Sequence, residues 1–308
     1  MTLKLNMNGS AEPFLNYLNR YLKIRDSLLL EIDTNKRAFV AKTFTEDKSS
    51  ILFSSLMFDD ANIKIISDDG EAERGDNRIK IGILVQLAKF IKIVKQLSNL
   101  TSKVVQKEVT EGETKVEKKE TISNFNIEIE YDVLVNQKDK STNFVATSTY
   151  FKSDKLKMRL DGFRISEFSY LSDEVFKNQV FYAEDAVTLE ITAAAINDII
   201  KISDIVKFDA RKDALIFYTK DKTLFVEDRG NGTEGKPNFV YNIGELDAEP
   251  QCSVSIPLTR ERFIRMLGNA SEDFKIIIGK SSNGSVDRLL FDSVTSTTKI
   301  AIAAMQNF

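Results

Sequence analysis

Two stretches of this sequence carry paired cations at the same spacing. Lys89 and Lys92 lie in Lys-Phe-Ile-Lys-Ile-Val, and Arg262 and Arg265 lie in Arg-Phe-Ile-Arg-Met-Leu, at a constant offset along the chain. The apolar residues of each stretch recur at helical spacing, which places the cations on the opposite face of a helix. Lysine and arginine without interleaved aromatic residues suit phosphate contacts that do not depend on base sequence. A duplicated, one-sided basic helix therefore favours a repetitive polyanion, DNA above all, as the ligand.

Two further predicted helices carry the same bias. One runs from about Glu12 to Ile24 and the other from about Thr192 to Ile205, and their apolar stripes leave basic residues on the outer face. Negative residues are few on these faces, with Asp204 and Glu261 as the exceptions. We predict a DNA-contact surface made of the cations on the four helices and beside them: Arg20, Lys23, Lys89, Lys92, Lys95, Lys201, Arg260, Arg262 and Arg265.

The chain has little equipment for catalysis. It contains no histidine and a single cysteine, Cys252, which excludes an intrachain disulfide and zinc sites of the usual Cys/His type. Nucleophile arrangements that need histidine as their base are excluded as well. Carboxylate, lysine or tyrosine chemistry remains, but no group of such residues resembles a nucleophile with its base. We predict no catalytic residue, no metal and no cofactor.

Two patterns match binding motifs only by their letters. Gly230-Asn231-Gly232-Thr233-Glu234-Gly235 reads G-x-G-x-x-G, but Pro237 and the strand-like Phe239–Ile243 follow where a dinucleotide site needs a helix. The glycines are more typical of a hairpin loop. A set of carboxylates in the polar loop Ser67–Asn77 fits no calcium-loop spacing and is more typical of a solvated acidic turn: Asp68, Asp69, Glu71 and Glu73.

Composition indicates a two-domain protein with gathered basic residues. The chain has 308 residues, of which 42% are hydrophobic and 29% charged, with a net charge of −3. A slightly acidic balance argues against coating nucleic acid with the whole surface, and it permits a single basic face. The chain shows no secretion signal at its start and no apolar run long enough to span a membrane, so we expect a soluble, cytoplasmic protein (host cytoplasm, if viral).

The order of predicted elements is repeated in the two halves. Each half reads as a strand, a helix, three or four strands, a second helix and three strands, which indicates an internal duplication. The strands of the first half are predicted around Leu3–Met7 and at Leu28–Ile32, Ala38–Phe44, Ile51–Phe58, Ile79–Ile83, Phe125–Tyr131, Asn143–Phe151 and Lys155–Leu160. Those of the second are predicted around Val187–Ile191 and Val254–Ile256 and at Val206–Ala210, Ala214–Thr219, Thr223–Asp228, Phe239–Ile243, Phe274–Ile278, Arg288–Phe291 and Lys299–Ala303.

The duplication sets the expected domain boundaries. We predict domain 1 at residues 1–165, a connector at 166–184 and domain 2 at 185–308. Domain 1 contains a charged insert at about 98–124 that reads either as a solvated hairpin around Glu111-Gly112 or as a mobile loop. The connector is rich in aromatic residues, which either pack onto a sheet or form part of a binding groove.

Two similar halves with basic helices against strand-rich sheets resemble the DNA sliding clamps, the ring-shaped processivity factors of replicative polymerases. The ending Lys299–Phe308 is similar to the last strand and short tail of clamps from tailed bacteriophages, and the likeness to the proliferating-cell-nuclear-antigen type is more distant. The resemblance implies an α+β clamp fold of two similar domains, each with two helices packed on antiparallel sheets. It also implies a homotrimeric ring of six domains with twelve helices lining the hole, in which edge strands pair across subunits.

The resemblance also implies partners. A ring around sequence-independent double-stranded DNA would dock a DNA polymerase and a clamp loader in an apolar groove, for which Phe168, Tyr170, Met305 and Phe308 are the candidates. The function would be topological and without catalysis. Two alternatives stay open: a non-catalytic β-rich structural or assembly protein with an internal duplication, and an enzyme that uses paired carboxylates.

Overall fold

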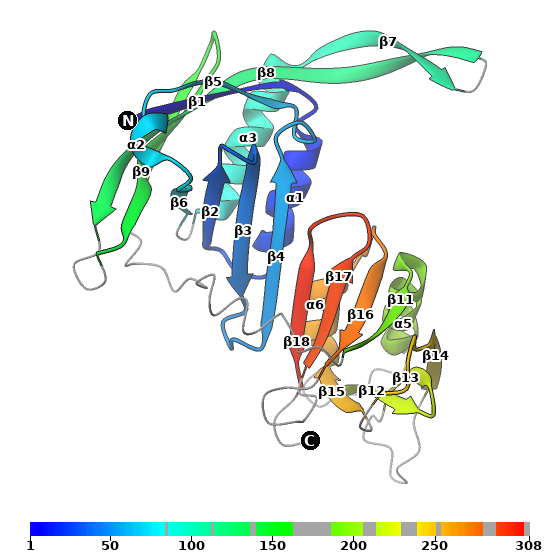
Figure 1. Ribbon diagram of the computed structural model, residues 1–308. Helices are drawn as coiled ribbons and strands as arrows, with labels where there is room; N and C mark the ends of the chain where they lie inside the picture. The colour runs from blue at the N-terminus through cyan, green and yellow to red at the C-terminus, as the bar shows by residue number, and fades with distance from the viewer. Residues whose placement is uncertain are drawn as a thin grey trace. The chain divides into compact units, whose positions relative to one another are not determined.

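The computed structural model consists of two units, each formed from two stretches of chain (Figure 1). Unit 1 comprises Met1–Lys42 and Ser55–Tyr170, and unit 2 comprises Thr43–Ser54 and Leu171–Phe308. The structure describes residues 1–83, 86–111, 114–135, 140–162, 186–205, 214–228, 239–250, 254–279 and 288–304, and of 106–120 the backbone alone. The predicted connector 166–184 lies outside these ranges, so the domain boundaries stay predictions.

The first half of the chain forms nearly all the elements expected there, with one addition discussed below. The described elements are β1 (Thr2–Gly9), α1 (Glu12–Leu22), β2 (Leu28–Asp33), β3 (Ala38–Phe44), β4 (Ser50–Met57), β5 (Ile63–Asp68), α2 (Glu71–Arg74), β6 (Ile79–Ile83), α3 (Leu87–Thr101), β7 (Lys103–Glu111), β8 (Thr114–Val135), β9 (Thr142–Lys152) and β10 (Lys157–Asp161).

The second half follows the expected order too. Its described elements are β11 (Val187–Ile191), α5 (Ala193–Ile205), β12 (Ala214–Lys220), β13 (Thr223–Asp228), β14 (Phe239–Glu245), β15 (Ser255–Thr259), α6 (Arg260–Leu267), β16 (Phe274–Ile278), β17 (Arg288–Ser293) and β18 (Lys299–Ala303). The predicted strand Val206–Ala210 lies outside the described residues.

Strand pairing repeats between the halves. In the first half β2 pairs with β3 and β6, and in the second β12 pairs with β13 and β15, all antiparallel. The series β1, β8, β9, β10 is matched by β11, β16, β17, β18. The predicted class of two similar α+β domains is confirmed. One short contact departs from it, because Ile79 and Lys80 of β6 lie parallel to Phe144 and Val145 of β9.

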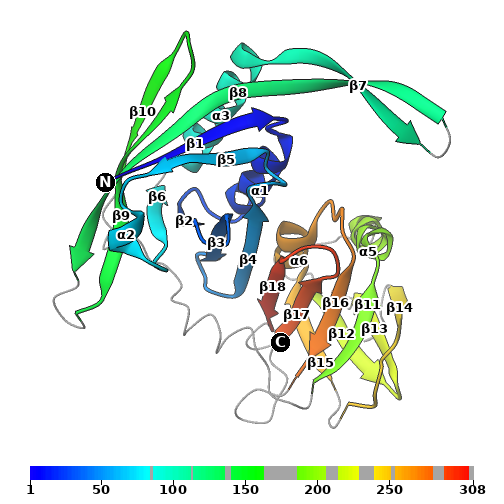
Figure 2. The ribbon, with the colours of Figure 1, turned by 45° about the horizontal axis from the view of Figure 1, so that its top comes forward.

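The charged insert is a hairpin and not a loop without strands. β7 and β8 pair antiparallel from Lys103 opposite Ile122 to Glu111 opposite Thr114. Figure 2 shows them leaving the rest of unit 1 as a two-stranded ribbon. Of the two alternatives left open by the sequence, the hairpin around Glu111-Gly112 is the one that the fold adopts.

Equivalent phenylalanines fix the helices of the two units. Phe90 of α3 meets Phe151 of β9 edge to face, with ring centroids 5.1 Å apart, and Phe263 of α6 meets Phe291 of β17 at 6.3 Å. In unit 1, Phe14 of α1 lies edge-on to Phe90 at 6.3 Å, so α1 and α3 lie side by side. Burying such rings contributes roughly 1.5–3 kcal/mol each. The buried faces leave the opposite faces of α3 and α6, with their cations, outermost.

The predicted polar loop Ser67–Asn77 is wrong in part, because a buried arginine organises it. Ser67 and Asp68 end β5, and α2 follows and ends at Arg74, whose side chain is fully buried. Arg74 forms an ion pair with Asp68 and donates hydrogen bonds to Thr34 Oγ1 at 2.6 Å and to the Asn77 carbonyl at 2.8 Å. The expected solvated acidic turn is therefore wrong for Asp68, whose carboxylate neutralises a buried cation.

Tyr131 completes this network and gives it a measurable alkaline limit. Its hydroxyl donates to Asp68 Oδ1 at 2.6 Å. Burial, with the neighbouring carboxylate, raises the pKa of Tyr131 from 10.0 to about 12. A raised pKa means that the neutral hydroxyl stabilises the fold below pH 10 and that this contribution is lost as the pH rises toward 12.

We expect Tyr131→Phe to remove this pH dependence. Between pH 10 and 12 the free energy of unfolding of the wild type should fall by about 2 kcal/mol more than that of the variant. Urea unfolding at a series of alkaline pH values measures the difference. Parallel curves for the two proteins over this range would contradict the prediction.

Candidate nucleic-acid interface

Helix α3 presents an uncompensated row of lysines. Lys89, Lys92 and Lys95 are exposed along its outer face, and the helix contains no aspartate or glutamate. None of the three lysines makes an ion pair among the residues that the structure describes. The helix extends to Thr101, beyond the predicted end near Leu97, and Thr101 Oγ1 donates to the Leu97 carbonyl at 2.8 Å.

The cations of α1 lie at its carboxyl end. Arg20 is in the last turn and half-buried, and Lys23 follows the helix and is exposed. Both have a partner within the chain. A positive charge at this end is favourable to the helix dipole, so these two cations also stabilise α1.

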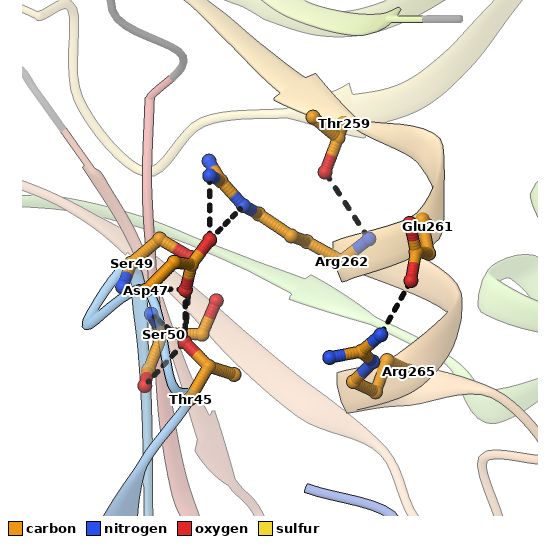
Figure 3. Close-up of polar contacts among 8 residues, drawn as sticks. All are labelled: Thr45, Asp47, Ser49, Ser50, Thr259, Glu261, Arg262 and Arg265. Carbon is orange, nitrogen blue, oxygen red and sulfur yellow. Dashed lines mark hydrogen bonds and ion pairs between the residues drawn. The ribbon is translucent and has the colours of Figure 1, made fainter. Parts of the chain in front are cut away.

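The arginines of α6 are held by carboxylates (Figure 3). The side chain of Thr259 caps the helix, because its Oγ1 accepts from the Arg262 amide at 3.2 Å. Arg262 donates to Asp47 Oδ2 from Nε at 3.1 Å and from Nη2 at 2.7 Å. One turn further, Arg265 is paired with Glu261 of the same helix.

Asp47 is oriented for this contact by the turn that carries it. Its Oδ1 accepts hydrogen bonds from Thr45 Oγ1 at 2.6 Å, from the Ser49 amide at 3.0 Å and from Ser49 Oγ at 2.6 Å. Partial burial would raise the pKa of Asp47, but the bonds from Ser49 and Thr45 and the charge of Arg262 outweigh it and hold the pKa well below its usual range. Asp47 and Arg262 both belong to unit 2.

Arg260 and Lys201 are also paired within unit 2. Arg260 is only 7% exposed, and it joins α6 to α5 through an ion pair with Asp204 and a 3.0 Å hydrogen bond from Nε to Ser203 Oγ. Lys201 lies 3.5 Å from Asp198 one turn away on α5. The structure thus places Arg260 in a packing contact, away from solvent. Of the carboxylates that pair with these cations, sequence reasoning recognised Asp204 and Glu261 and missed Asp47 and Asp198.

Several predicted features lie outside the described residues. They include the candidate docking residues Phe168, Tyr170, Met305 and Phe308, the glycine-rich stretch 230–235 and Cys252. Among the residues that are described, no helix has the length and hydrophobicity required to cross a membrane. Within the same residues no group of aspartate, glutamate, cysteine or histidine is arranged to hold a metal ion.

Comparison with known proteins gives a fold and no close relative. No protein-family profile matches the chain, and no curated protein is similar in sequence. Among solved structures, PCNA of A. fulgidus bound to the C-terminal region of FEN-1 superimposes with a TM-score of 0.60 at 10% identity over 99% of both chains.

Two further structures agree with the first. Proliferating Cellular Nuclear Antigen from Entamoeba histolytica matches with a TM-score of 0.58 at 12% identity over 99% of both chains. PCNA from Thermococcus kodakaraensis matches with a TM-score of 0.57 at 13% identity, over 98% of this chain and 100% of its own. Likeness at such low identity establishes architecture alone, and it agrees with the repeated pairing of the two halves. The chain therefore has the PCNA-like clamp fold.

Proposed function

We propose that this protein is a sliding clamp, which encircles duplex DNA and tethers the replicative DNA polymerase as a processivity factor. The exposed lysine row of α3, on a clamp fold, is the observation that carries this proposal. Long lysine side chains make weak, exchangeable contacts to phosphates whatever the base sequence, and such contacts permit sliding. The mechanism needs no bond to be made or broken, so the protein would act without catalysis.

The contact of β18 with β4 provides a template for the joints of a ring. β18 pairs antiparallel with β4 from Lys299 opposite Phe53 to Ile302 opposite Ser50, and the Ala303 amide donates to the Ser49 carbonyl at 2.8 Å. Because hydrogen-bonded pairs alternate along an antiparallel ladder, Ala301 and Lys299 also direct their backbone groups to β4. A buried apolar cluster supports the joint and consists of Phe44, Ile51, Leu290 and Ala301.

β10 repeats β18 but has an open edge among the described strands. The Gly162 amide donates to the Thr147 carbonyl, and the Ser153 amide to the Leu156 carbonyl, both at 2.8 Å. The even-numbered residues of β10 therefore bond to β9, and Lys157 and Arg159 direct their backbone groups outward. β14, the repeat of β4, is the terminal strand of its described sheet.

Pairing of β10 in one copy with β14 in the next would repeat the β18–β4 contact between chains. The contact is head to tail, so it produces a ring where the rotation closes. The sliding-clamp resemblance implies six domains, and hence three copies of this two-domain chain. Ring closure would also cover both open edges, which otherwise invite aggregation.

The further partners follow from the same proposal. A DNA polymerase and a clamp loader would dock through short apolar segments, as the C-terminal region of FEN-1 does on the A. fulgidus protein. We place the protein in the cytoplasm, in DNA replication. Its closeness to phage clamps stays a prediction.

Solution mass and topological retention test the proposal together. Light scattering should give three times the chain mass of 34.9 kDa over a range of protein concentrations. After loading, the protein should stay on closed circular DNA and leave when one cut linearises that DNA. A strict monomer would contradict self-assembly, and equal retention on circular and linear DNA would contradict the topological mechanism.

A further inference from the structure

The helix cations fall into two groups according to their partners. Among the described residues, the lysines of α3 in unit 1 have no carboxylate within ion-pair distance. In unit 2 every cation of α5 and α6 has one: Lys201 with Asp198, Arg260 with Asp204, Arg262 with Asp47 and Arg265 with Glu261. Four positive and four negative charges leave these helices locally neutral.

We propose that Lys89, Lys92 and Lys95 of α3 make the principal phosphate contacts with duplex DNA, and that Asp47 holds Arg262 out of those contacts. This inference rests on the proposed sliding-clamp function and deepens it. The two halves look equivalent in sequence, so the inference assigns unequal work to equivalent helices.

The lysines of α3 are suited to several phosphates at once. They recur every three residues, so they extend over about 9 Å of helix at 1.5 Å per residue. Duplex DNA carries one negative charge per roughly 1.7 Å of its axis, so more than one phosphate lies within reach of this row. The exposed side chains of Gln96 and Asn99 add neutral donors near the carboxyl end of the row. No acidic residue of α3 opposes an approaching phosphate.

Arg262 is occupied by an anion that the fold has already positioned. Two hydrogen bonds join its guanidinium to Asp47 Oδ2, and the other oxygen of Asp47 accepts three from Thr45 and Ser49. Charge-assisted contacts with both partners fixed are stronger than the usual surface pair. A DNA phosphate would have to displace this carboxylate, which exchanges one anion for another. Binding therefore gains little from Arg262 while Asp47 is charged.

The position of Asp47 depends on the segment Thr43–Ser54, which belongs to unit 2 although it comes from the first half of the chain. Asp47 lies in the turn before β4, and the pairing of β4 with β18 sets the place of that turn within unit 2. Removing the carboxylate while keeping the turn should therefore release Arg262 without loss of the joint.

The test is duplex binding by the assembled protein as a function of salt, with a short fluorescent duplex and anisotropy as the readout. The single variants Lys89→Gln, Lys92→Gln and Lys95→Gln should each lower affinity about threefold to tenfold at low salt and reduce the salt slope by up to about 0.9. Arg262→Gln should change affinity by less than about twofold, since its charge is already compensated.

Asp47→Asn should raise affinity about threefold or more, because it frees one cation per chain. The matched control is Asp59→Asn, which removes the same charge from an exposed pair with Arg37, 3.3 Å away, on a turn of unit 1. The control should leave affinity within about 1.5-fold of the wild type. Circular dichroism and solution mass verify that each variant folds and assembles.

Each outcome decides between the inference and the function beneath it. If the wild type binds but Arg262→Gln weakens binding as much as Lys92→Gln, the unequal division is wrong and the clamp function stands. If Asp47→Asn and Asp59→Asn behave alike, the role of Asp47 is wrong. A wild type without salt-dependent binding and without retention on circular DNA would remove the clamp function and the inference with it. The lysine and Arg262 variants leave the Asp47 turn untouched, so they decide the division even where Asp47→Asn unfolds.

Discussion

The substitution Arg159→Pro is expected to convert the trimeric ring into single chains. Arg159 directs its backbone N–H to the open edge of β10, so a proline there removes a donor for the next copy and leaves the β9 ladder intact. Each joint would lose a hydrogen bond and meet the proline ring, at a cost of about 1–3 kcal/mol or more. Light scattering should then give the mass of one chain, and retention on circular DNA should disappear.

Arg159→Ala is the matched control, because it removes the same side chain and keeps the amide. The side chain contacts Asp161 at 2.8 Å and Ser148 at 3.0 Å, both within unit 1, so both variants lose these contacts. The alanine variant should remain a trimer. The proposed joint would be wrong if the proline variant folded and also stayed trimeric, or if alanine separated the chains as completely as proline.

The substitution Arg74→Leu is expected to destabilise the protein by about 3–5 kcal/mol, because it leaves the Asp68 carboxylate buried without a cation. Arg74 is fully buried, and the side chain of Asp68 is only 5% exposed. Thr34 and the Asn77 carbonyl would also lose their donor. Urea unfolding near pH 7 should show an earlier transition, which belongs to the part of the chain around α2.

Two companions separate the loss of charge pairing from the change of side chain. Arg37→Leu breaks an exposed pair with Asp59 and should cost less than about 1 kcal/mol. Adding Asp68→Asn to Arg74→Leu should recover part of the stability, since the neutral amide is cheaper to bury than a charge. If Arg74→Leu unfolds at the wild-type midpoint, or if Asp68→Asn makes it worse, the buried pair does not stabilise this region.

The sequence by itself determined the elements and the faces of the helices. Apolar residues at helical spacing around Phe90 and Phe263 placed these rings inward and the cations outward, and the structure confirms both helices and the repeated strand order. These features depend on residues close in the chain, whose periodicity is legible without knowledge of the fold. The hairpin of the insert stayed one of two alternatives, because its charged residues carry no apolar face.

Only the tertiary structure decided which cations remain available to a ligand. Arg262 and Lys92 look alike in sequence, yet the partner of Arg262 lies 215 residues away, on a turn that the pairing of β4 with β18 brings into unit 2. The burial of Arg74 beside Asp68 has the same origin, since Thr34 and Tyr131 converge there from distant parts of the chain. Ion pairing acts over a few ångströms of space, and the order of residues along a chain does not encode that proximity.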